Sequence, residues 1–302
     1  MIGPLGALPR RVLVTGADGS IGRATTERLI GLGVAVTALS LDFAADSPAD
    51  RVIVGDARDE ATVAGALEGA DAVVHLAAIP HPSLGTPAVV FGTNAVATFT
   101  VLAQAGQAGV QRAVIASSIN AFGVPMNTNQ VMPAYYPLDE EIPADIADGY
   151  SLSKQADEAS ARMAFRRWGI SSVALRFPLI KDRDTLLRSA EDIANDPSSM
   201  AREGWAYLDL RDGVRAIELA LTVPLSGAHV VGLSADDLLI DRPAAELLRA
   251  YAPSVPVRGV IGAHGPLVDT TRARDLLGFE PQHSIHRPDR ADDELELGAL
   301  RA

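Results

Sequence analysis

Tyr150 and Lys154 stand four residues apart in the stretch GYSLSKQADEASARMAFRRWG, which has a helical pattern. In an α-helix this spacing puts two side chains on one face, about one turn apart. An ammonium beside a phenol favours the phenolate and lowers the phenol's pKa from about 10, so that the hydroxyl can exchange protons near neutral pH. The pair predicts a general acid/base device, although an amphipathic helix with a surface lysine has the same spacing.

A glycine-rich turn is the second candidate for chemistry. In VLVTGADGSIGRATTERL (12–29), a strand-like run leads into Gly16, Gly19 and Gly22, after which the apolar spacing becomes helical. Such a turn gathers backbone amides at a helix N-terminus, where a dinucleotide pyrophosphate binds and where side chains would block its close approach. We predict a dinucleotide site here, while a tight strand-to-helix turn without a ligand would share the pattern.

The composition narrows the classes of function. The chain has 302 residues, is 48% hydrophobic, carries 26 basic and 38 acidic residues for a formal net charge of −12, and contains no cysteine. This is enough apolar sequence for one large domain or two closely associated ones. No run of lysine and arginine indicates nucleic acid. A disulfide, a thiolate nucleophile and a cysteine-bound metal are excluded, and the histidines show no metal-type spacing, so we expect no metal.

The N-terminus and one apolar stretch bear on location and assembly. MIGPLGALPRR lacks a basic leading region, is broken by Pro4 and Pro9, and runs into the first strand, so we expect an intracellular, cytoplasmic chain. Residues 82–111 contain no charge, but polar residues such as Asn94 and Gln104 interrupt them. We expect a buried helix rather than a membrane span, and its nearly uniform apolar character favours a homodimer.

Strand-like and helix-like stretches alternate along the first part of the chain. After the first strand and helix come β-like runs at 34–40, 51–54, 72–76, 112–117 and 172–177, with helix-like stretches at about 58–69, 88–108 and 150–168. This order predicts an α/β fold with a Rossmann-type doubly wound parallel sheet and ligands at the carboxyl ends of its strands.

The alternation of strand-like and helix-like stretches becomes less regular after residue 178. A Pro-, Asp- and Ser-rich stretch over 181–204 precedes helix-like stretches near 209–222, 241–251 and 271–277 and a strand near 228–232. We expect residues 1–178 to form a dinucleotide-binding domain that includes the catalytic residues. Residues 179–302 should form a smaller C-terminal substrate-binding lobe, partly interleaved with the first.

Three motifs agree with one known family. GADGSIG, VIASSINAFG and YSLSK occur in the order and spacing of the extended short-chain dehydrogenase/reductase family, also called the NAD-dependent epimerase/dehydratase family, which the sequence resembles. The resemblance continues in GDARD (55–59), VVHLAA (73–78), NAVAT (94–98), YLDLRDGVRAI (207–217) and DTTRARDLLGFEP (269–281). It covers nearly the whole chain, and jointly these matches are far more specific than any one of them.

The resemblance implies catalytic roles at the matching positions. Tyr150 would be the acid/base, Lys154 would hold the nicotinamide ribose and favour the phenolate, and Ser118 would hydrogen-bond the reacting oxygen. Ser118 is preferred to Ser117 by counting back from the end of VIASSINAFG. Together they would move a proton and stabilise an alkoxide while a hydride passes to or from the nicotinamide.

The resemblance also implies a set of positions for the cofactor, NAD, with NADP not excluded. They are Gly16, Gly19, Ser20, Ile21 and Gly22 at the pyrophosphate turn, Ser40 and Asp42 after the second strand, Asp56 and Ala57 at the adenine pocket, Leu76, Ala77 and Ala78 after the fourth strand, Asn94 as the family's helix-initiating asparagine, Lys154, and Phe177. Asp56 could instead be a helix cap and Asn94 a buried hydrogen-bonded amide.

One departure bears on the choice between NAD and NADP. Ser40 stands where many NAD-using members carry Asp or Glu to bind the ribose hydroxyls, and Asp42 follows two residues later. Asp42 could reach the ribose, or the site could tolerate a 2′-phosphate. Position 41 has no basic residue to bind that phosphate, so NAD is favoured.

Family membership leaves the reaction open. Ile119 and Asn120 stand where sugar dehydratases have an Asp and a Glu, which weakens dehydration, and RFPLIKDRD lacks the asparagine of many nucleotide-sugar epimerases. The chain is similar to uronate dehydrogenases in length and in VIASSINAFG, although residues 189–206 look like an insertion relative to them. Substrate-binding positions would be Pro80, Ser118, Asn120, Tyr150 and Arg188. Arg188 would bind a substrate carboxylate, or be an ordinary surface arginine.

We therefore expect an NAD(P)-dependent oxidoreductase. It would transfer a hydride between the nicotinamide and a secondary alcohol or carbonyl of a small sugar-like molecule, sugar acids included. The alternative is an NAD-dependent nucleotide-sugar epimerase. An alternative of another class is a non-catalytic dinucleotide-sensing regulator, which has no need of the acid/base set of Ser118, Tyr150 and Lys154.

Overall fold

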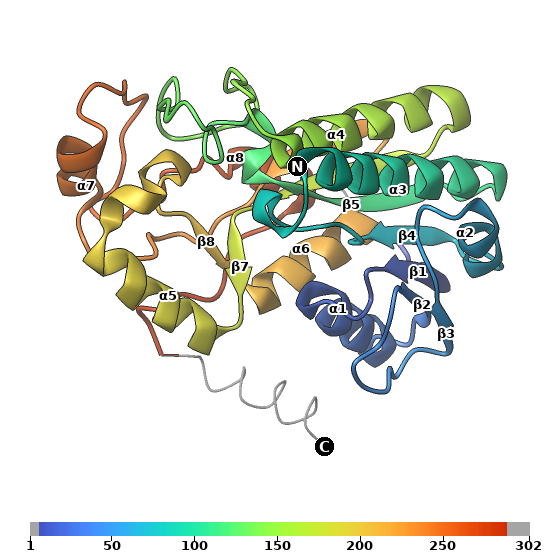
Figure 1. Cartoon of the computed structure of the whole chain (residues 1–302). Helices are drawn as coiled ribbons and strands as arrows, with labels where there is room; N and C mark the ends of the chain where they lie inside the picture. Colours follow the sequence, from blue (N-terminus) through green and yellow to red (C-terminus); the bar gives the residue numbers. More distant parts are fainter. Residues whose placement is uncertain (1–5, 289–302) are drawn as a thin grey trace.

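A seven-stranded parallel sheet forms the centre of the protein in a computed structural model that describes residues 6–288. The strand order is β3-β2-β1-β4-β5-β6-β9 (Figure 1). The strands are β1 (Arg11–Thr15), β2 (Ala35–Ser40), β3 (Arg51–Val54), β4 (Ala72–His75), β5 (Arg112–Ser118), β6 (Ser171–Phe177) and β9 (Ala228–Gly232). This is the Rossmann-type sheet that the alternation predicted, so the predicted fold class is confirmed.

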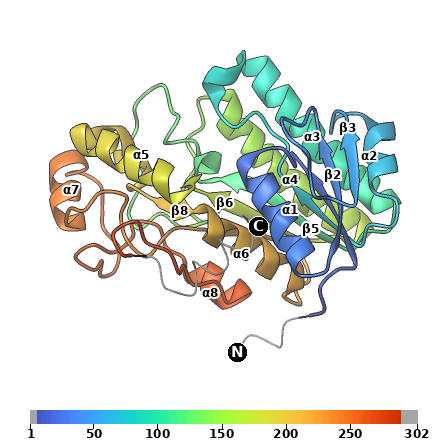
Figure 2. The ribbon, with the colours of Figure 1, turned by 90° about the horizontal axis from the view of Figure 1, so that it is seen from below.

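Helices cover both faces of the sheet, which explains the continuous apolar runs of its strands. One face packs against α2 (Glu60–Ala66), α3 (Pro87–Gln107) and α4 (Gly149–Trp168), and the other against α1 (Ser20–Gly31), α6 (Leu210–Thr222) and α8 (Thr271–Leu277) (Figure 1, Figure 2). Within β1, Leu13 packs into the core that lies between the sheet and α2, α3 and α4. Val12 and Val14 pack into the core that lies between the sheet and α1, α6 and α8. Successive residues of a strand face opposite sides, so the four positions of β1 from Val12 to Thr15 are all buried.

The carboxyl ends of the central strands meet at one edge of the sheet. Thr15 at the end of β1 lies beside His75 at the end of β4, and Ser118 at the end of β5 lies beside Phe177 at the end of β6. The order of the strands reverses between β1 and β4, which leaves a crevice at this edge. The catalytic and cofactor motifs predicted from the sequence follow these same strands.

A smaller lobe lies beside this edge (Figure 1). It contains β7 (Leu179–Lys181) paired in parallel with β8 (Tyr207–Asp209), α5 (Arg183–Asn195), the 3₁₀ turn η3 (Pro197–Glu203) and α7 (Ala244–Tyr251). Its core includes the fully buried Trp205 and Tyr207 and also receives Tyr136 from the segment between β5 and α4. Strand β9 belongs to the main sheet, and α6 and α8 pack against it. We therefore propose a division near residue 178 in which the C-terminal part of the chain contributes both to the main domain and to the smaller lobe.

The Pro-, Asp- and Ser-rich stretch over 181–204 contains a regular helix. Asp182 caps α5, since its side chain accepts a hydrogen bond from the backbone N–H of Thr185. Leu186 and Ile193 then recur on one face of the helix and pack against the core of the lobe. Asp184 and Asp192 are exposed on this helix, while Pro197, Ser198 and Ser199 belong to the following turn η3.

Helix α3 is the one helix within residues 6–288 that is long and apolar enough to cross a membrane. Of its apolar window, 56% is buried inside the protein, and α3 packs along α4. Its buried positions include the polar residues Asn94, Thr98 and Gln104. A core helix has these properties, as the sequence led us to expect.

A buried ion pair joins α4 to the sheet. The guanidinium of Arg176 on β6 donates to both carboxylate oxygens of Glu158 on α4, from Nε to Oε1 at 2.8 Å and from Nη2 to Oε2 at 3.0 Å. The hydroxyl of Ser117 on β5 donates to the same Oε1 at 2.8 Å. The contact fixes α4, which carries Tyr150 and Lys154, against the carboxyl ends of two strands.

Replacing Glu158 by alanine should lower the free energy of unfolding by about 3–5 kcal/mol, because Arg176 would stay buried without its carboxylate. The matched control is Glu68→Ala, which removes a 77% exposed partner of Arg51 and should cost less than about 1 kcal/mol. Urea unfolding followed by circular dichroism measures both variants. Equal losses in the two would contradict the role given to the buried pair.

Candidate active site

A cavity of about 510 Å³ lies where the carboxyl edge of the sheet faces the smaller lobe. Of the residues predicted from sequence, it is lined by Ile21, Leu76, Ala78, Pro80, Ser118, Asn120, Tyr150, Lys154 and Phe177. The lobe side contributes Leu179, Ile180, Lys181, Ser189, Asp192, Ile193, Met200 and Glu203. The structure therefore brings the predicted catalytic residues together with the start of α1 and with a wall from the C-terminal part of the chain.

Tyr150 and Lys154 lie in the first turns of α4, one above the other. Asp148 caps this helix by accepting from the N–H of Ser151 at 2.8 Å. Lys154 is only 3% exposed, and its Nζ lies 5.8 Å from the centroid of the Tyr150 ring. The ammonium donates to the carbonyl of Ala116 at 2.8 Å, so the lysine is bonded to β5 as well as to its own helix.

Asp157 is a partner of Lys154 that the sequence analysis missed. Its Oδ2 lies 3.2 Å from the Lys154 Nζ, and both side chains are buried. Burial lowers the pKa of Lys154, but the charges of Asp157 and Tyr150 outweigh it and leave that pKa above its ordinary value. Burial raises the pKa of Asp157, against the opposing effects of Lys154 and the Thr98 hydroxyl. The spacing of a carboxylate three residues after a helical lysine could have indicated the pair.

A buried chain of hydrogen bonds through Thr15, His75 and Thr98 lies close to Lys154. The Thr15 Oγ1 accepts from the two backbone amides that follow His75, both at 3.3 Å, and lies 2.7 Å from the His75 Nδ1. Its own proton therefore goes to Nδ1, which leaves Nε2–H to donate to the Thr98 Oγ1 at 3.0 Å. Burial, aided by the charge of Lys154, lowers the pKa of His75 to about 3, so the ring is neutral. This neutral chain connects β1 with α3.

Ser118 ends β5 and caps the 3₁₀ turn η2 (Ile119–Phe122). Its Oγ accepts from the Asn120 backbone N–H at 3.1 Å and from the Asn120 Nδ2 at 3.2 Å. The Ser118 hydroxyl proton is thus left to donate elsewhere. The hydroxyl of Ser117 is bonded to Glu158 instead, which agrees with the choice of Ser118. The Asn120 Oδ1 is buried without a partner within residues 6–288 and so offers an acceptor.

The glycine turn leaves no room for side chains at Gly16 and Gly22. Gly16 has φ +65°, and a Cβ there would lie 2.7 Å from the Ala77 N. A Cβ on Gly22 would lie 2.2 Å from the Gly16 carbonyl oxygen. Gly19 caps α1 without a side chain to accept from the first helical amides, and Ser20 and Ile21 follow it. The free amides and the positive end of the helix dipole suit an anion.

The residues expected near the cofactor ribose follow β2. Ser40 is its last residue and is partly buried, and Asp42 is exposed in the following loop. Asp18 in the glycine turn accepts from the Ala44 N–H at 3.2 Å, which ties this loop to the turn. The loop therefore lies beside the predicted pyrophosphate site, and the choice between Ser40 and Asp42 as ribose ligand stays a prediction.

Asp56 and Ala57 follow β3. Ala57 is buried, whereas the Asp56 carboxylate accepts from the Arg58 side chain, which lowers the pKa of Asp56. Asp59, not Asp56, caps α2, by accepting from the N–H of Thr62 at 2.7 Å. Their role at the adenine stays a prediction.

Asn94 does not initiate a helix, contrary to the role expected for it. Helix α3 begins at Pro87 with Thr86 as its cap, so Asn94 lies about two turns inside. Its Oδ1 accepts from the Ile79 N–H at 2.7 Å, and its Nδ2 donates to the Ile79 carbonyl and the Ser153 Oγ, both at 3.1 Å. Asn94 is thus a buried amide that holds the loop after β4 in place.

Arg188 lies outside the cavity. It is exposed on α5 and donates from Nη2 to the Thr185 Oγ1 at 2.9 Å, while Ser189 and Asp192 of the same helix line the cavity. Its binding of a substrate carboxylate stays a prediction that this placement does not favour. Lys181 and Glu203 were missed because their stretch had no recognisable pattern.

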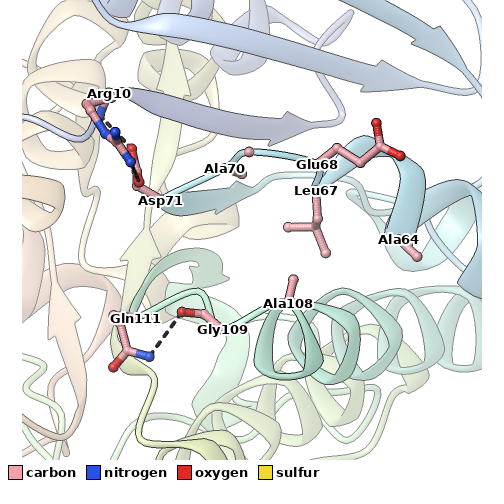
Figure 3. A pocket seen from close by; sticks show the side chains of 10 residues that line it. Arg10, Ala64, Leu67, Glu68, Ala70, Asp71, Ala108, Gly109 and Gln111 are labelled. Atoms are coloured by element: carbon pink, nitrogen blue, oxygen red, sulfur yellow. Dashed lines mark hydrogen bonds and ion pairs between the residues drawn. The ribbon is translucent and has the colours of Figure 1, made fainter.

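A second hollow, of about 630 Å³, lies at the opposite edge of the sheet (Figure 3). Arg10 and Asp71 form an ion pair on its rim, with Arg10 Nη2 3.0 Å from Asp71 Oδ1, and Gln111 donates to the Gly109 carbonyl. These residues adjoin the amino ends of β1, β4 and β5, whereas ligands of parallel sheets bind at the carboxyl ends. The hollow is therefore not the candidate site.

Comparison with known proteins identifies the family of the chain. The model of the NAD dependent epimerase/dehydratase family matches residues 12–180. L-arabinose 1-dehydrogenase (NAD(P)(+)) of Haloferax volcanii is 31% identical over 75% of this chain and 89% of its own length. Uronate dehydrogenase of Pseudomonas putida is 31% identical over 55% of this chain, a match that spans 59% of that relative.

The fold agrees as well. The structure of a short-chain dehydrogenase/reductase superfamily protein from Agrobacterium tumefaciens with bound NAD superimposes with a TM-score of 0.70, at 25% identity and with 96% of each chain covered. The chain belongs to the NAD-dependent epimerase/dehydratase family. The predicted resemblance and enzyme class are confirmed, and the neighbour's bound NAD agrees with the predicted cofactor.

Replacing Gly22 by alanine should weaken NAD binding by at least about tenfold, because the new methyl group would displace the Gly16 carbonyl and distort the turn. Isothermal titration calorimetry measures the affinity. The control is Gly31→Ala on the same helix, where the structure has open space around a Cβ and affinity should not change. Wild-type affinity in Gly22→Ala would show that the turn does not hold the cofactor.

Proposed function

We propose that this protein is an NAD(P)-dependent oxidoreductase, with NAD preferred, that transfers a hydride to or from a secondary alcohol or carbonyl of a small sugar-like substrate. The observation that carries the proposal is that Ser118, Tyr150 and Lys154 line one cavity together with Ile21 of the glycine turn. The two sequence relatives named above, dehydrogenases of an aldose and of a uronate, support the substrate class.

The residues present fit a dinucleotide. Gly16 and Gly22 leave room that a Cβ would fill, and the uncapped start of α1 would bind the pyrophosphate. Lys154 uses two of its three N–H groups on Ala116 and Asp157, which leaves one for a ribose hydroxyl. When bound, the nicotinamide supplies or accepts the hydride.

The chain's own residues would handle the proton. Ser118 has both acceptor positions used by Asn120, so its hydroxyl donates to the reacting oxygen and holds it in the cavity. Tyr150 would take the proton of the alcohol during oxidation and return it during reduction. The buried charge of Lys154 would stabilise the phenolate formed in that exchange.

NAD is preferred to NADP on the charges after β2. Leu41 is exposed and carries no charge, while Asp42 is acidic. Acidic groups repel a 2′-phosphate and accept from ribose hydroxyls. The cytoplasmic location expected from the sequence stays a prediction.

Two other functions remain open to direct tests. A nucleotide-sugar epimerase would turn over without added NAD, because its cofactor is oxidised again in each cycle. A dinucleotide-sensing regulator would bind NAD without any turnover. The acid/base set of Ser118, Tyr150 and Lys154 in one cavity favours an enzyme over a regulator.

Tyr150→Phe should lower kcat by about 100- to 10,000-fold, because the phenyl ring cannot exchange a proton. NAD affinity should change little, since the glycine turn is intact. Turnover is followed by nicotinamide absorbance with a panel of aldoses, sugar acids and nucleotide sugars. Tyr251→Phe on α7, outside the cavity lining, is the control. Undiminished turnover in Tyr150→Phe would reject the catalytic assignment.

We also propose a homodimer formed through α3 and α4. Val96 and Phe99 on α3 are 48% and 51% exposed, and Leu152 on α4 is 46% exposed, which is unusual for large apolar side chains on two packed helices. Light scattering should give twice the chain mass of 31.6 kDa, and Phe99→Asp should shift the mass toward one chain. A wild-type mass of one chain would refute the dimer.

A further inference from the structure

The lobe side of the cavity carries charged groups of its own. Glu203 of η3 and Asp192 of α5 are acidic, and Lys181 at the end of β7 is basic. Between them the wall is apolar, with Ile193 and Met200 among its members. A few polar groups on an apolar wall are the usual means by which a cavity orients a small ligand.

Glu203 provides a carboxyl group on the lobe side of the cavity. It is partly buried, and its carboxyl has no hydrogen-bond or ion-pair partner within residues 6–288. The neighbouring Arg202 donates instead to the carbonyls of Val124 and Asn127. Burial raises the pKa of Glu203 to about 7, against the opposing charge of Arg202. Both protonation states are therefore accessible near neutral pH, and the carboxyl can accept or donate hydrogen bonds.

An unpartnered carboxyl in a partly dehydrated cavity costs free energy that a ligand hydroxyl would recover. A sugar ring offers neighbouring hydroxyl groups that suit the two oxygens of one carboxyl group. An anionic ligand meets a different environment. On this wall Glu203 and Asp192 together outnumber Lys181, and the charge of Lys154 across the cavity is already paired with Asp157. Like charges brought together in a site reduce affinity.

We propose that Glu203 binds hydroxyl groups of the substrate and that the substrate is an uncharged sugar rather than a sugar acid or a nucleotide sugar. This rests on the proposed function, since it assumes that the substrate reacts at Tyr150 in the same cavity. Glu203 is then the residue that distinguishes among sugars, while the proton exchange belongs to Tyr150 and Ser118.

Matched substrates test the charge preference. D-Galactose and D-galacturonate, like D-glucose and D-glucuronate, differ only in a hydroxymethyl group against a carboxylate at carbon 6. With NAD and the wild-type enzyme, at least one neutral sugar should react with a kcat/KM about tenfold or more above that of its uronate. UDP-glucose should react more slowly than either neutral sugar.

Variants test the residue. Glu203→Ala should lower kcat/KM for the neutral sugar by about 10- to 100-fold, mainly through KM, because a ground-state hydrogen bond is lost. Glu203→Gln, which keeps the shape and an acceptor oxygen, should recover part of that loss. Glu191→Ala on α5, exposed and outside the lining, is the matched control and should behave as wild type. NADH affinity, measured by fluorescence, should be the same in all of them.

A preference for the uronates overturns the inference, while the proposed hydride transfer stands. Loss of uronate oxidation in Lys181→Met would then identify Lys181 as the cation that binds the uronate carboxylate. An effect of Glu203→Ala no larger than that of Glu191→Ala also overturns it. The proposed function fails in a different way. In that case the wild type reduces no NAD with any sugar, and calorimetry of its NADH complex detects neither D-galactose nor D-galacturonate, so both proposals are rejected.

Discussion

The buried ammonium of Lys154 is the charge on which the arrangement of the site depends. A charge that is 3% exposed must be paired and hydrogen-bonded, and it is, by the Ala116 carbonyl at 2.8 Å and the Asp157 carboxylate at 3.2 Å. These bonds hold the start of α4 against the end of β5. They thereby set the position of Tyr150, one helical turn before the lysine, relative to Ser118.

Other buried polar contacts hold the elements around Lys154 in place. Glu158, on the same helix, is bonded to Arg176 on β6 and Ser117 on β5, so α4 is attached to two strands at their carboxyl ends. His75 is neutral and satisfied on both nitrogens by threonine hydroxyls. A site built from such bonds is held in place before a ligand arrives, which is what hydride and proton transfer require.

In the proposed function, the smaller lobe contributes selectivity and the main sheet with its helix α4 contributes the chemistry. Its β7, α5 and η3 form the wall opposite the acid/base residues, and that wall carries Glu203, Asp192 and Lys181. The proposed acid/base residues come from β5 and α4, and the groups that would contact the rest of the substrate come from the lobe.

Local pattern determined the sheet, the glycine turn and the Tyr150–Lys154 pair, because periodicity, glycine geometry and helical spacing are properties of neighbouring residues. The tertiary structure decided the rest. Asp157 and Glu203 acquire their properties from burial, which depends on segments distant in sequence. For the same reason Asn94 proved to be a buried amide inside α3, and Arg188 lies outside the cavity that its neighbours line, since the direction of a side chain depends on how its helix packs.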